Sequence, residues 1–286
     1  MNTNVIISSD STTDLSQELK ERYGIRILPL GVTLGDKTYR DGVDITPDMI
    51  YEHHDRTGEL PKTAATNVGE CADFFSELTQ GGKSVVHFTI SSDMSSTYSN
   101  ACIAAQDFDN VYVVDTRNLS NGGGLLVTAA AEMAYNGMPA KEIAEKCTEL
   151  AKCVDASFVI DSLEYLYKGG RCSALSMLGA NLLKIKPCIQ VRNGVMGVGK
   201  KYRGKFKDVI LQYVDETLQD TSDILPDRIF IANAGCEKDI VDDLYEKIKS
   251  YGFFKEIFLT RAGCTISSHC GADTVGIFFM RKSPLQ

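Results

Sequence analysis

Short apolar runs alternate with amphipathic stretches through the first half of the chain. Runs rich in β-branched residues predict four strands: Val5–Ser8, Ile25–Leu34, Ser84–Ile90 and Asn110–Asp115. Apolar positions at helical spacing predict five helices: Asp14–Tyr23, Pro47–Thr57, Val68–Thr79, Thr97–Ala105 and Gly122–Gly137. Asp14 is the expected N-cap of the first helix, and Pro29 suggests an edge or a bulge in the second strand. Because strands and helices alternate, we expect a mainly parallel sheet with helices on both faces.

The last of these helices, Gly122–Gly137, is rich in alanine and apolar almost all round. A helix without a polar face is normally buried on most of its sides. We therefore expect it to lie inside the molecule.

The second half of the chain has a different pattern. Its apolar runs predict six strands: Ser157–Asp161, Cys188–Arg192, Val195–Val198, Arg228–Ala232, Phe258–Thr260 and Thr274–Phe279. Helical spacing predicts three helices: Leu163–Lys168, Phe206–Leu218 and Lys238–Tyr251. Asn193-Gly194 separates two of the strands and is a strong signal for a β-hairpin. A hairpin with helices on one side indicates an α+β unit.

At 286 residues, the chain is long enough for two domains. The change of pattern predicts an N-terminal α/β domain at residues 1–155 and a C-terminal α+β domain at residues 156–286. No low-complexity linker separates them, so we expect the two to pack closely. A ligand is then expected between or within them.

Composition narrows the class of protein. The hydrophobic fraction of 43% and the charged fraction of 24% are ordinary for a soluble globular protein, and no run approaches the ~20 apolar residues of a membrane span. The start of the chain lacks the basic region of a signal peptide, so a cytoplasmic location is expected. The net charge of −8 argues against nucleic acid as a partner. Nine scattered cysteines without metal-site spacing are expected to be buried and reduced, and no metal is expected.

The charge is unevenly distributed. Between Glu164 and Asp208 no acidic residue occurs, and the basic residues there are Lys168, Arg171, Lys184, Lys186, Arg192, Lys200, Lys201, Arg203, Lys205 and Lys207. This basic segment is either a solvated face or a docking surface for an anionic partner.

Motifs of self-contained enzymes are absent. Gly194-x-x-x-x-Gly199-Lys200 resembles a phosphate-binding loop, but Lys201 follows where serine or threonine is required, and the segment lies in a predicted hairpin. The sequence has no Gly-x-Ser-x-Gly elbow, no His-Glu-x-x-His and no Gly-x-Gly-x-x-Gly after a strand. A nucleotide-binding enzyme or a metalloprotease is therefore poorly supported.

Polar segments at the ends of apolar runs remain as candidate sites. Residues 61–67 precede a predicted helix, and residues 91–97 follow a predicted strand. In an open parallel sheet, ligands bind at the carboxyl ends of strands and close to helix N-termini, where anions are favoured. Serine and threonine in such places are also common caps and turns. His269 is predicted in a small-residue loop before the last strand and is expected either to contact a ligand or to be structural.

Read together, these segments resemble the DegV family from end to end. The matching motifs, in order, are Asp10-Ser11-Thr12-Thr13-Asp14-Leu15, Pro29-Leu30, Tyr39-Arg40-Asp41-Gly42, Pro61-Lys62-Thr63, Ser95-Ser96-Thr97-Tyr98, Leu163-Glu164-Tyr165-Leu166-Tyr167-Lys168-Gly169-Gly170-Arg171 and His269-Cys270-Gly271.

The resemblance implies a DegV-like two-domain fold that binds a long-chain fatty acid in an internal tunnel, without any further cofactor. It implies that Thr63, Ser95 and His269 contact the fatty-acid carboxylate. Arg171, Arg203 and Ser96 would support this site, at its mouth or on a surface facing a kinase. The protein itself would not be an enzyme: a partner acyl kinase would phosphorylate the bound acid for phospholipid synthesis. Transient contact with a membrane surface for lipid exchange is compatible with this role.

The chain also departs from the family pattern. Ala64, Ala65 and Thr66 replace the usual residues of the first loop, and Ser96 replaces a glycine. The proline that usually precedes the histidine is absent, and Thr265 lies in its region. These changes alter the rim of the head-group site and bear on ligand preference. The apolar segments 124–131 and 177–183 are candidates for the tunnel wall, although core packing is the favoured explanation for most of their residues.

Two other functions compete with this interpretation. The first is a stand-alone lipid carrier or sensor. The second is an acyl hydrolase with Ser95 as nucleophile and His269 as base. The sequence offers neither an acidic residue to orient His269 nor a nucleophile elbow around Ser95, so the hydrolase is the weaker alternative.

Overall fold

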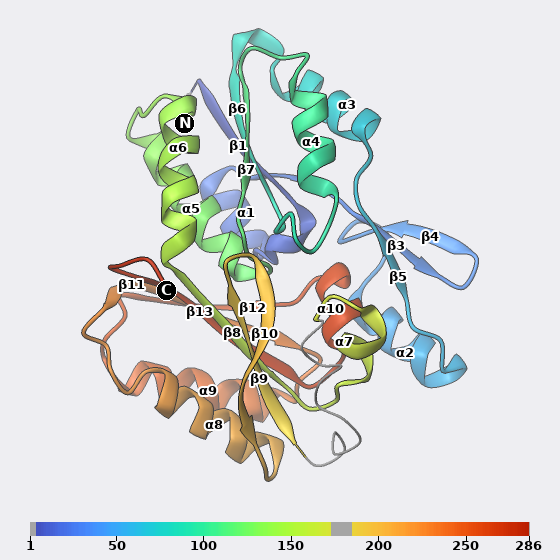
Figure 1. Cartoon of the computed structure of the whole chain (residues 1–286), viewed down its shortest axis with the longest axis vertical. Helices are drawn as coiled ribbons and strands as arrows, with labels where there is room; N and C mark the ends of the chain where they lie inside the picture. Colours follow the sequence, from blue (N-terminus) through green and yellow to red (C-terminus); the bar gives the residue numbers. More distant parts are fainter. Residues whose placement is uncertain (1–3, 173–184, 286) are drawn as a thin grey trace.

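The computed structural model describes residues 4–172 and 185–285. Two main β-sheets lie one above the other in Figure 1, and a small third sheet projects from one side. One apolar cluster contains residues from both main sheets, including Val86 and Phe88 of the first and Phe158 and Phe278 of the second. The two halves of the chain therefore share a core.

The first sheet is parallel throughout and has the strand order β2-β1-β6-β7. Its strands are β1 (Val5–Asp10), β2 (Arg26–Leu28), β6 (Ser84–Thr89) and β7 (Val111–Asp115). Helices α1 (Gln17–Tyr23), α5 (Asn121–Tyr135) and α6 (Ala140–Leu150) cover one face, and α3 (Val68–Leu78) and α4 (Thr97–Ala105) cover the other. Successive strand side chains alternate between the faces: Val85 packs on α3 and α4, whereas Val86 packs in the shared core.

The second sheet is mixed and has the order β10-β9-β8-β13-β11-β12, in which only β11 and β12 are parallel. Its strands are β8 (Val154–Ile160), β9 (Lys186–Arg192), β10 (Val195–Tyr202), β11 (Ile224–Ala234), β12 (Glu256–Arg261) and β13 (Thr274–Arg281). Helices α8 (Phe206–Thr217) and α9 (Lys238–Ser250) cover one face. Helix α5 packs on the other face, so it lies between the two main sheets.

Close approach of α5 to the loop after β1 explains the glycines with which this helix begins. A Cβ atom on Gly123 would lie 3.1 Å from Thr13 Cγ2, and one on Gly124 would lie 3.0 Å from Leu15 Cδ2. A side chain at either position would require its neighbours to shift by a few tenths of an ångström, so glycine allows the closest packing.

The third sheet is antiparallel, with β3 (Gly31–Leu34) between β4 (Lys37–Arg40) and β5 (Lys62–Ala64). Three helices pack beside it: α2 (Pro47–Thr57), α7 (Glu164–Gly169) and α10 (Cys264–Cys270). Among the described residues, three short 3₁₀ turns are also found: η1 (Ser11–Thr13), η2 (Gln80–Gly82) and η3 (Ala151–Cys153).

The predicted α/β class, the parallel first sheet with helices on both faces, and the hairpin at Asn193-Gly194 are confirmed. The expected burial of the 122–137 helix is confirmed as well, since α5 is buried along most of its length.

Several predictions of local structure are wrong. The expected strand Ile25–Leu34 is two strands in different sheets, because Pro29 interrupts it. Asp14 is not the N-cap of α1: it ends η1 in a left-handed conformation (φ 51°), and Ser16 caps α1 instead. Helix α6 and strands β4 and β5 were not expected. His269 lies in the last turn of helix α10 rather than in a loop.

Candidate functional site

Two adjoining pockets lie where the sheets and α10 meet. The outer pocket has a volume of about 290 Å³ and includes the side chains of Thr63, Ser95, Ser96, Arg171 and His269. Five of the six predicted site residues are therefore brought together, although they come from four separate parts of the chain. The sixth, Arg203, lines neither pocket and lies exposed after β10.

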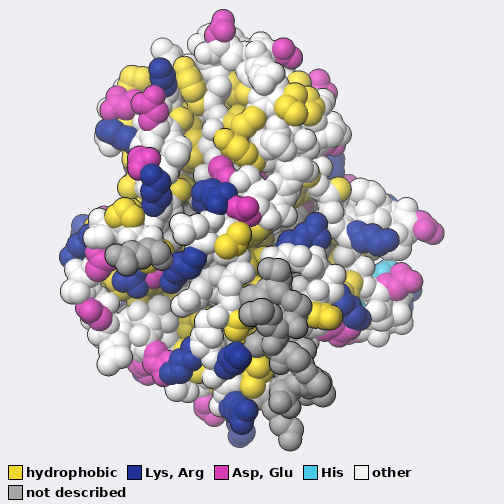
Figure 2. Space-filling view, in the orientation of Figure 1, with side chains coloured by type: hydrophobic (Ala, Val, Ile, Leu, Met, Phe, Trp, Pro, Cys, Tyr) yellow, Lys and Arg dark blue, Asp and Glu magenta, His cyan; other side chains and the backbone are white. Residues whose placement is uncertain are grey.

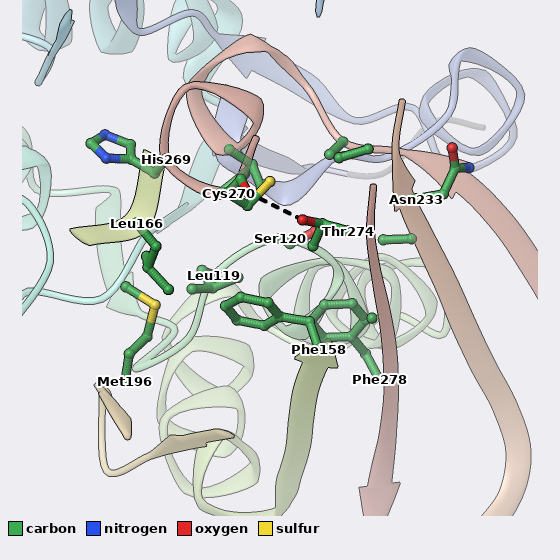
Figure 3. Close-up of a pocket in the computed structure, with 15 residues that line it drawn as sticks. Leu119, Ser120, Phe158, Leu166, Met196, Asn233, His269, Cys270, Thr274 and Phe278 are labelled. Carbon is green, nitrogen blue, oxygen red and sulfur yellow. Dashed lines mark hydrogen bonds between the residues drawn. The ribbon is translucent and has the colours of Figure 1, made fainter. Parts of the chain in front are cut away.

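The inner pocket continues from the outer one. Four residues line both: Leu119, Met196, Ile266 and His269. We call these four residues the neck. Beyond them the inner pocket is a narrow slot of about 50 Å³ whose walls are mostly apolar, with Leu166 beside Met196 and with Phe158 and Phe278 side by side (Figure 3).

The predicted tunnel segments take no described part in these walls. Residues 124–131 belong to α5 and line neither pocket, so core packing explains them. Residues 177–183 lie outside the described residues.

His269 connects the two pockets chemically. Its Nε2 lies 2.8 Å from the hydroxyl oxygen of Thr63. Burial, together with the nearby Arg171 cation, lowers the pKa of His269 to about 4, so the imidazole is neutral at pH 7. If Nε2 carries the proton, His269 donates to Thr63, and the Thr63 hydroxyl is free to donate to a ligand.

Gly169 of α7 packs closely against the Nδ1 side of the His269 imidazole. A Cβ atom on Gly169 would lie 2.7 Å from His269 Nδ1, so only glycine allows this approach of α7. Nδ1 is buried and has no hydrogen-bond partner among the described residues. In particular, no carboxylate orients the ring as a general base requires.

Ser95 also lines the outer pocket and lies in the loop between β6 and α4. Its Oγ is 2.9 Å from Thr97 Oγ1 and accepts the Thr97 N–H at 3.2 Å. Among the described contacts, Ser95 makes none with His269, so no nucleophile–base pair is formed. The amide of Asn100 donates to the Thr66 carbonyl at 2.8 Å, which ties α4 to the segment after Thr63.

Helix α10, which carries His269, is held at its N-terminus by two buried carboxylates. Asp41 accepts the N–H groups of Cys264 at 2.8 Å and Thr265 at 3.0 Å, and also the Thr265 hydroxyl at 2.6 Å. Asp14 accepts the Gly263 N–H at 2.8 Å. These carboxylates satisfy N–H groups that the first turn of a helix leaves free.

The surroundings of these acids are strongly desolvated. Burial raises the pKa of Asp14 well above its usual value and that of the neighbouring Asp10 to about 6. Ser120, which lines the inner pocket, donates its hydroxyl to Asp14 at 2.5 Å. The same carboxylate therefore supports both α10 and the inner pocket.

Sequence reasoning did not find the positioning roles of Asp14 and Asp41, nor the place of Met196 and Leu119 in the neck. A signal existed for the two acids, because both lie in the motifs Asp10–Leu15 and Tyr39–Gly42 that carry the family resemblance. No such signal marked Met196 or Leu119, which are ordinary apolar residues of a hairpin and a loop.

Chemically, the two pockets suit an amphiphile. Hydroxyl groups, a neutral imidazole and a guanidinium at the outer pocket can donate to a small anionic head group. The apolar slot behind the neck can take a tail. Among the described residues, no group of histidine, cysteine or carboxylate side chains is arranged to bind a metal ion.

Comparison with known proteins identifies the family. The family model described as "Uncharacterised protein, DegV family" matches residues 4–282. The chain belongs to the DegV family. It is 31% identical to Protein DegV of Bacillus subtilis over 287 residues, covering 98% of this chain and 100% of that protein.

Solved DegV structures have the same fold. A DegV family protein from Thermus thermophilus, described by its fatty acid binding, superposes with a TM-score of 0.90 at 28% identity, covering 97% of this chain and 99% of that one. A stearic-acid-binding protein from Eubacterium ventriosum gives 0.83 at 27% identity, covering 96% and 98%. In the described part of this chain, no helix is long and apolar enough to cross a bilayer.

Proposed function

We propose that this protein binds a long-chain fatty acid and presents its carboxylate to a separate acyl kinase. The observation that carries the first part is the pair of adjoining pockets, with Thr63, Ser95 and His269 at the polar outer one and apolar side chains behind the neck. The fatty-acid binding described for DegV proteins of similar fold supports the same ligand class.

The energetics favour such a ligand. A carboxylate withdrawn from water requires several donors, and the hydroxyls of Thr63 and Ser95 supply short charge-assisted hydrogen bonds. Each buried methylene contributes ~0.8 kcal/mol, so a dozen contribute about 10 kcal/mol before the costs of association. Because the inner slot is narrow, the chain must displace side chains, and the flexible Met196 is the most adaptable of them.

Binding is tested by native mass spectrometry followed by organic extraction. We expect the added mass of a fatty acid that leaves intact. Thr63→Val and Ser95→Ala should each weaken binding by about tenfold or more, because each removes a hydrogen bond to a charged group. Ser99→Ala, at an exposed serine of α4, is the matched control. A protein that takes up no fatty acid at all would refute the proposal.

The kinase part rests on chemistry and on charge. The carboxylate would be the nucleophile, and the nucleotide would be held by the partner. The basic segment is the candidate docking face, but half of it is already paired with acids: Lys168, Lys186, Arg192, Lys200 and Lys207. Figure 2 shows Lys and Arg side chains across this face, several of them beside acidic ones.

The remaining cations define the docking face more narrowly. Among the described residues, no ion pair is found for Arg171, Lys201, Arg203 or Lys205, and Lys184 lies outside the described residues. Reversal of the charge at Lys201, Arg203 and Lys205 should weaken coupling to an acyl kinase without emptying the pocket. Lys141→Glu, at an exposed lysine of α6, is the control. Unchanged acyl-phosphate formation in the charge-reversal variant would exclude this face as the docking site. If the wild-type protein supports no acyl-phosphate formation with any kinase tested, a stand-alone carrier is favoured.

A further inference from the structure

The turn of the β9–β10 hairpin is tied to the parallel sheet. Ser91, two residues after β6, donates its hydroxyl to the Gly194 carbonyl at 2.7 Å, and both groups are buried. The guanidinium of Arg117, two residues after β7, donates to the Asn193 carbonyl. Two loops at the carboxyl ends of neighbouring strands therefore hold one turn.

Arg117 is itself held in an unusual conformation. Its φ of 50° lies in the left-handed region, which non-glycine residues rarely adopt unless other contacts impose it. Here Asp115 accepts its backbone N–H at 2.8 Å, Asp93 pairs with Nη1 at 2.5 Å, and Ser92 accepts from Nη1 at 3.1 Å. These contacts aim the guanidinium at the hairpin turn.

At the turn, the Arg117 guanidinium packs directly against Gly194. A Cβ atom on Gly194 would lie 2.5 Å from Arg117 Cζ, and the φ of Gly194 is 86°. The positive φ favours glycine at this turn, and the missing side chain leaves space in which the guanidinium lies.

The tied segments all carry residues of the proposed ligand site. Met196 follows Gly194 by two residues, and Leu119 follows Arg117 by two; both belong to the neck. Ser95 follows Ser91 by four residues and lines the outer pocket. Because β10 is an edge strand that pairs only with β9, its first residues have no second strand to restrain them.

We propose that Arg117 is a positioning residue that holds Met196 in the neck and thereby sets the rate at which an acyl ligand enters and leaves. This inference rests on the proposed fatty-acid binding. Arg117 lines neither the outer nor the inner pocket, so it acts through the hairpin turn.

The test is a double-mutant cycle on ligand exchange. Transfer of a fluorescent long-chain fatty acid from the protein to phosphatidylcholine vesicles is followed by stopped flow for wild type, Arg117→Ala, Met196→Ala and the double variant. Arg117→Ala should raise the transfer and uptake rates together by about tenfold, which changes Kd less than either rate. The double variant should exchange ligand no faster than Met196→Ala alone, because Arg117 affects exchange only through the position of Met196.

Arg26→Ala is the matched control, since Arg26 is an exposed arginine of β2 that forms an ion pair with Glu77 on the surface. It should leave both rates unchanged. Additive effects in the cycle, or an Arg117→Ala protein that exchanges ligand at the wild-type rate, would overturn the proposal. So would a rise in Kd that merely follows a fall in Tm, because that is the signature of general destabilisation.

A second measurement separates this inference from the proposed function. Hydrogen exchange of the 193–198 amides needs no ligand, and it should be faster in Arg117→Ala than in wild type or Arg26→Ala. If hydrogen exchange is faster in Arg117→Ala but the protein takes up no fatty acid, Arg117 does hold the hairpin turn and the proposed ligand is refuted. Unchanged exchange would refute the tie whatever the ligand.

Discussion

Asp41 offers a direct test of how the helix bearing His269 is held. Its carboxylate is 3% exposed and accepts four hydrogen bonds: from the N–H groups of Cys264 and Thr265, the Thr265 hydroxyl and the Ser11 hydroxyl. Asp41→Ala removes all four acceptor contacts, whereas Asp41→Asn keeps one carbonyl oxygen and places an amide N–H₂ against donors. The two substitutions should therefore both be harmful, to different degrees.

The magnitude follows from the groups left without partners. Loss of a helix N-cap typically costs about 1 kcal/mol, and each buried donor left unsatisfied costs about 1–3 kcal/mol. Since water can reach part of the space that alanine vacates, we expect Asp41→Ala to lower the free energy of unfolding by about 3–5 kcal/mol. Asp41→Asn should lower it by about 2 kcal/mol. Typical total stabilities of 5–15 kcal/mol leave both variants measurable.

The assay is urea unfolding followed by circular dichroism, with fatty-acid affinity measured where each variant remains folded. Affinity should fall as well, because α10 also carries His269. Asp48→Ala is the control: Asp48 pairs with Arg261 on the surface, with a side chain 59% exposed, so its loss should cost less than about 1 kcal/mol. If Asp41→Ala unfolds within about 0.5 kcal/mol of wild type, the carboxylate does not hold α10.

Three further predictions concern histidines and their neighbours. Titration of His269 by NMR should give a pKa near 4 without ligand and a higher one when a carboxylate is bound, since an anion favours the imidazolium; an unchanged value would place the anion elsewhere. Gly169→Ala should weaken fatty-acid binding by about tenfold because its Cβ displaces the His269 ring, whereas Gly197→Ala, with open space around it, should not. Burial lowers the pKa of His87 to about 3, so the unfolded state binds more protons between pH 3 and about 6.5, and stability is lost as the pH falls through this range. That loss is ~2 kcal/mol between pH 7 and 5, and urea unfolding should show it reduced in His87→Gln; an equal loss in both proteins would contradict the assignment.

The sequence predicted the layered part of the fold because its signals are local. Strand β6 is a largely buried run, β7 is a short run rich in valine, and α5 lacks a polar face, so a few neighbouring residues suffice to predict each element. The three-stranded sheet was missed for the opposite reason. Lys62–Ala64 is short, polar and largely exposed, and it becomes a strand only because β3 lies beside it.

Helix α10 shows a second limit of local pattern. Apart from Ile266, its residues, Cys264–Cys270, are small or polar and show no helical apolar period, so the segment was interpreted as a loop. Seven such residues form a helix here because distant carboxylates satisfy the first-turn N–H groups. The position of His269 relative to Thr63 could therefore be inferred only from the family resemblance, not from periodicity.

These contacts also explain why the family motifs are more numerous than the ligand-facing residues. Asp14 and Asp41 lie in two motifs near the start of the chain, and each accepts hydrogen bonds from the segment just before or within the first turn of α10. A third motif supplies Gly169, whose missing side chain leaves space for the imidazole. Of these motifs, only those containing Thr63, Ser95, Arg171 and His269 place polar side chains in the outer pocket. Asp14 and Asp41 fix the helix on which His269 is carried, and Gly169 leaves space for the His269 ring. Substitutions at these three positions should therefore impair ligand binding through geometry, without removing any group that touches the ligand.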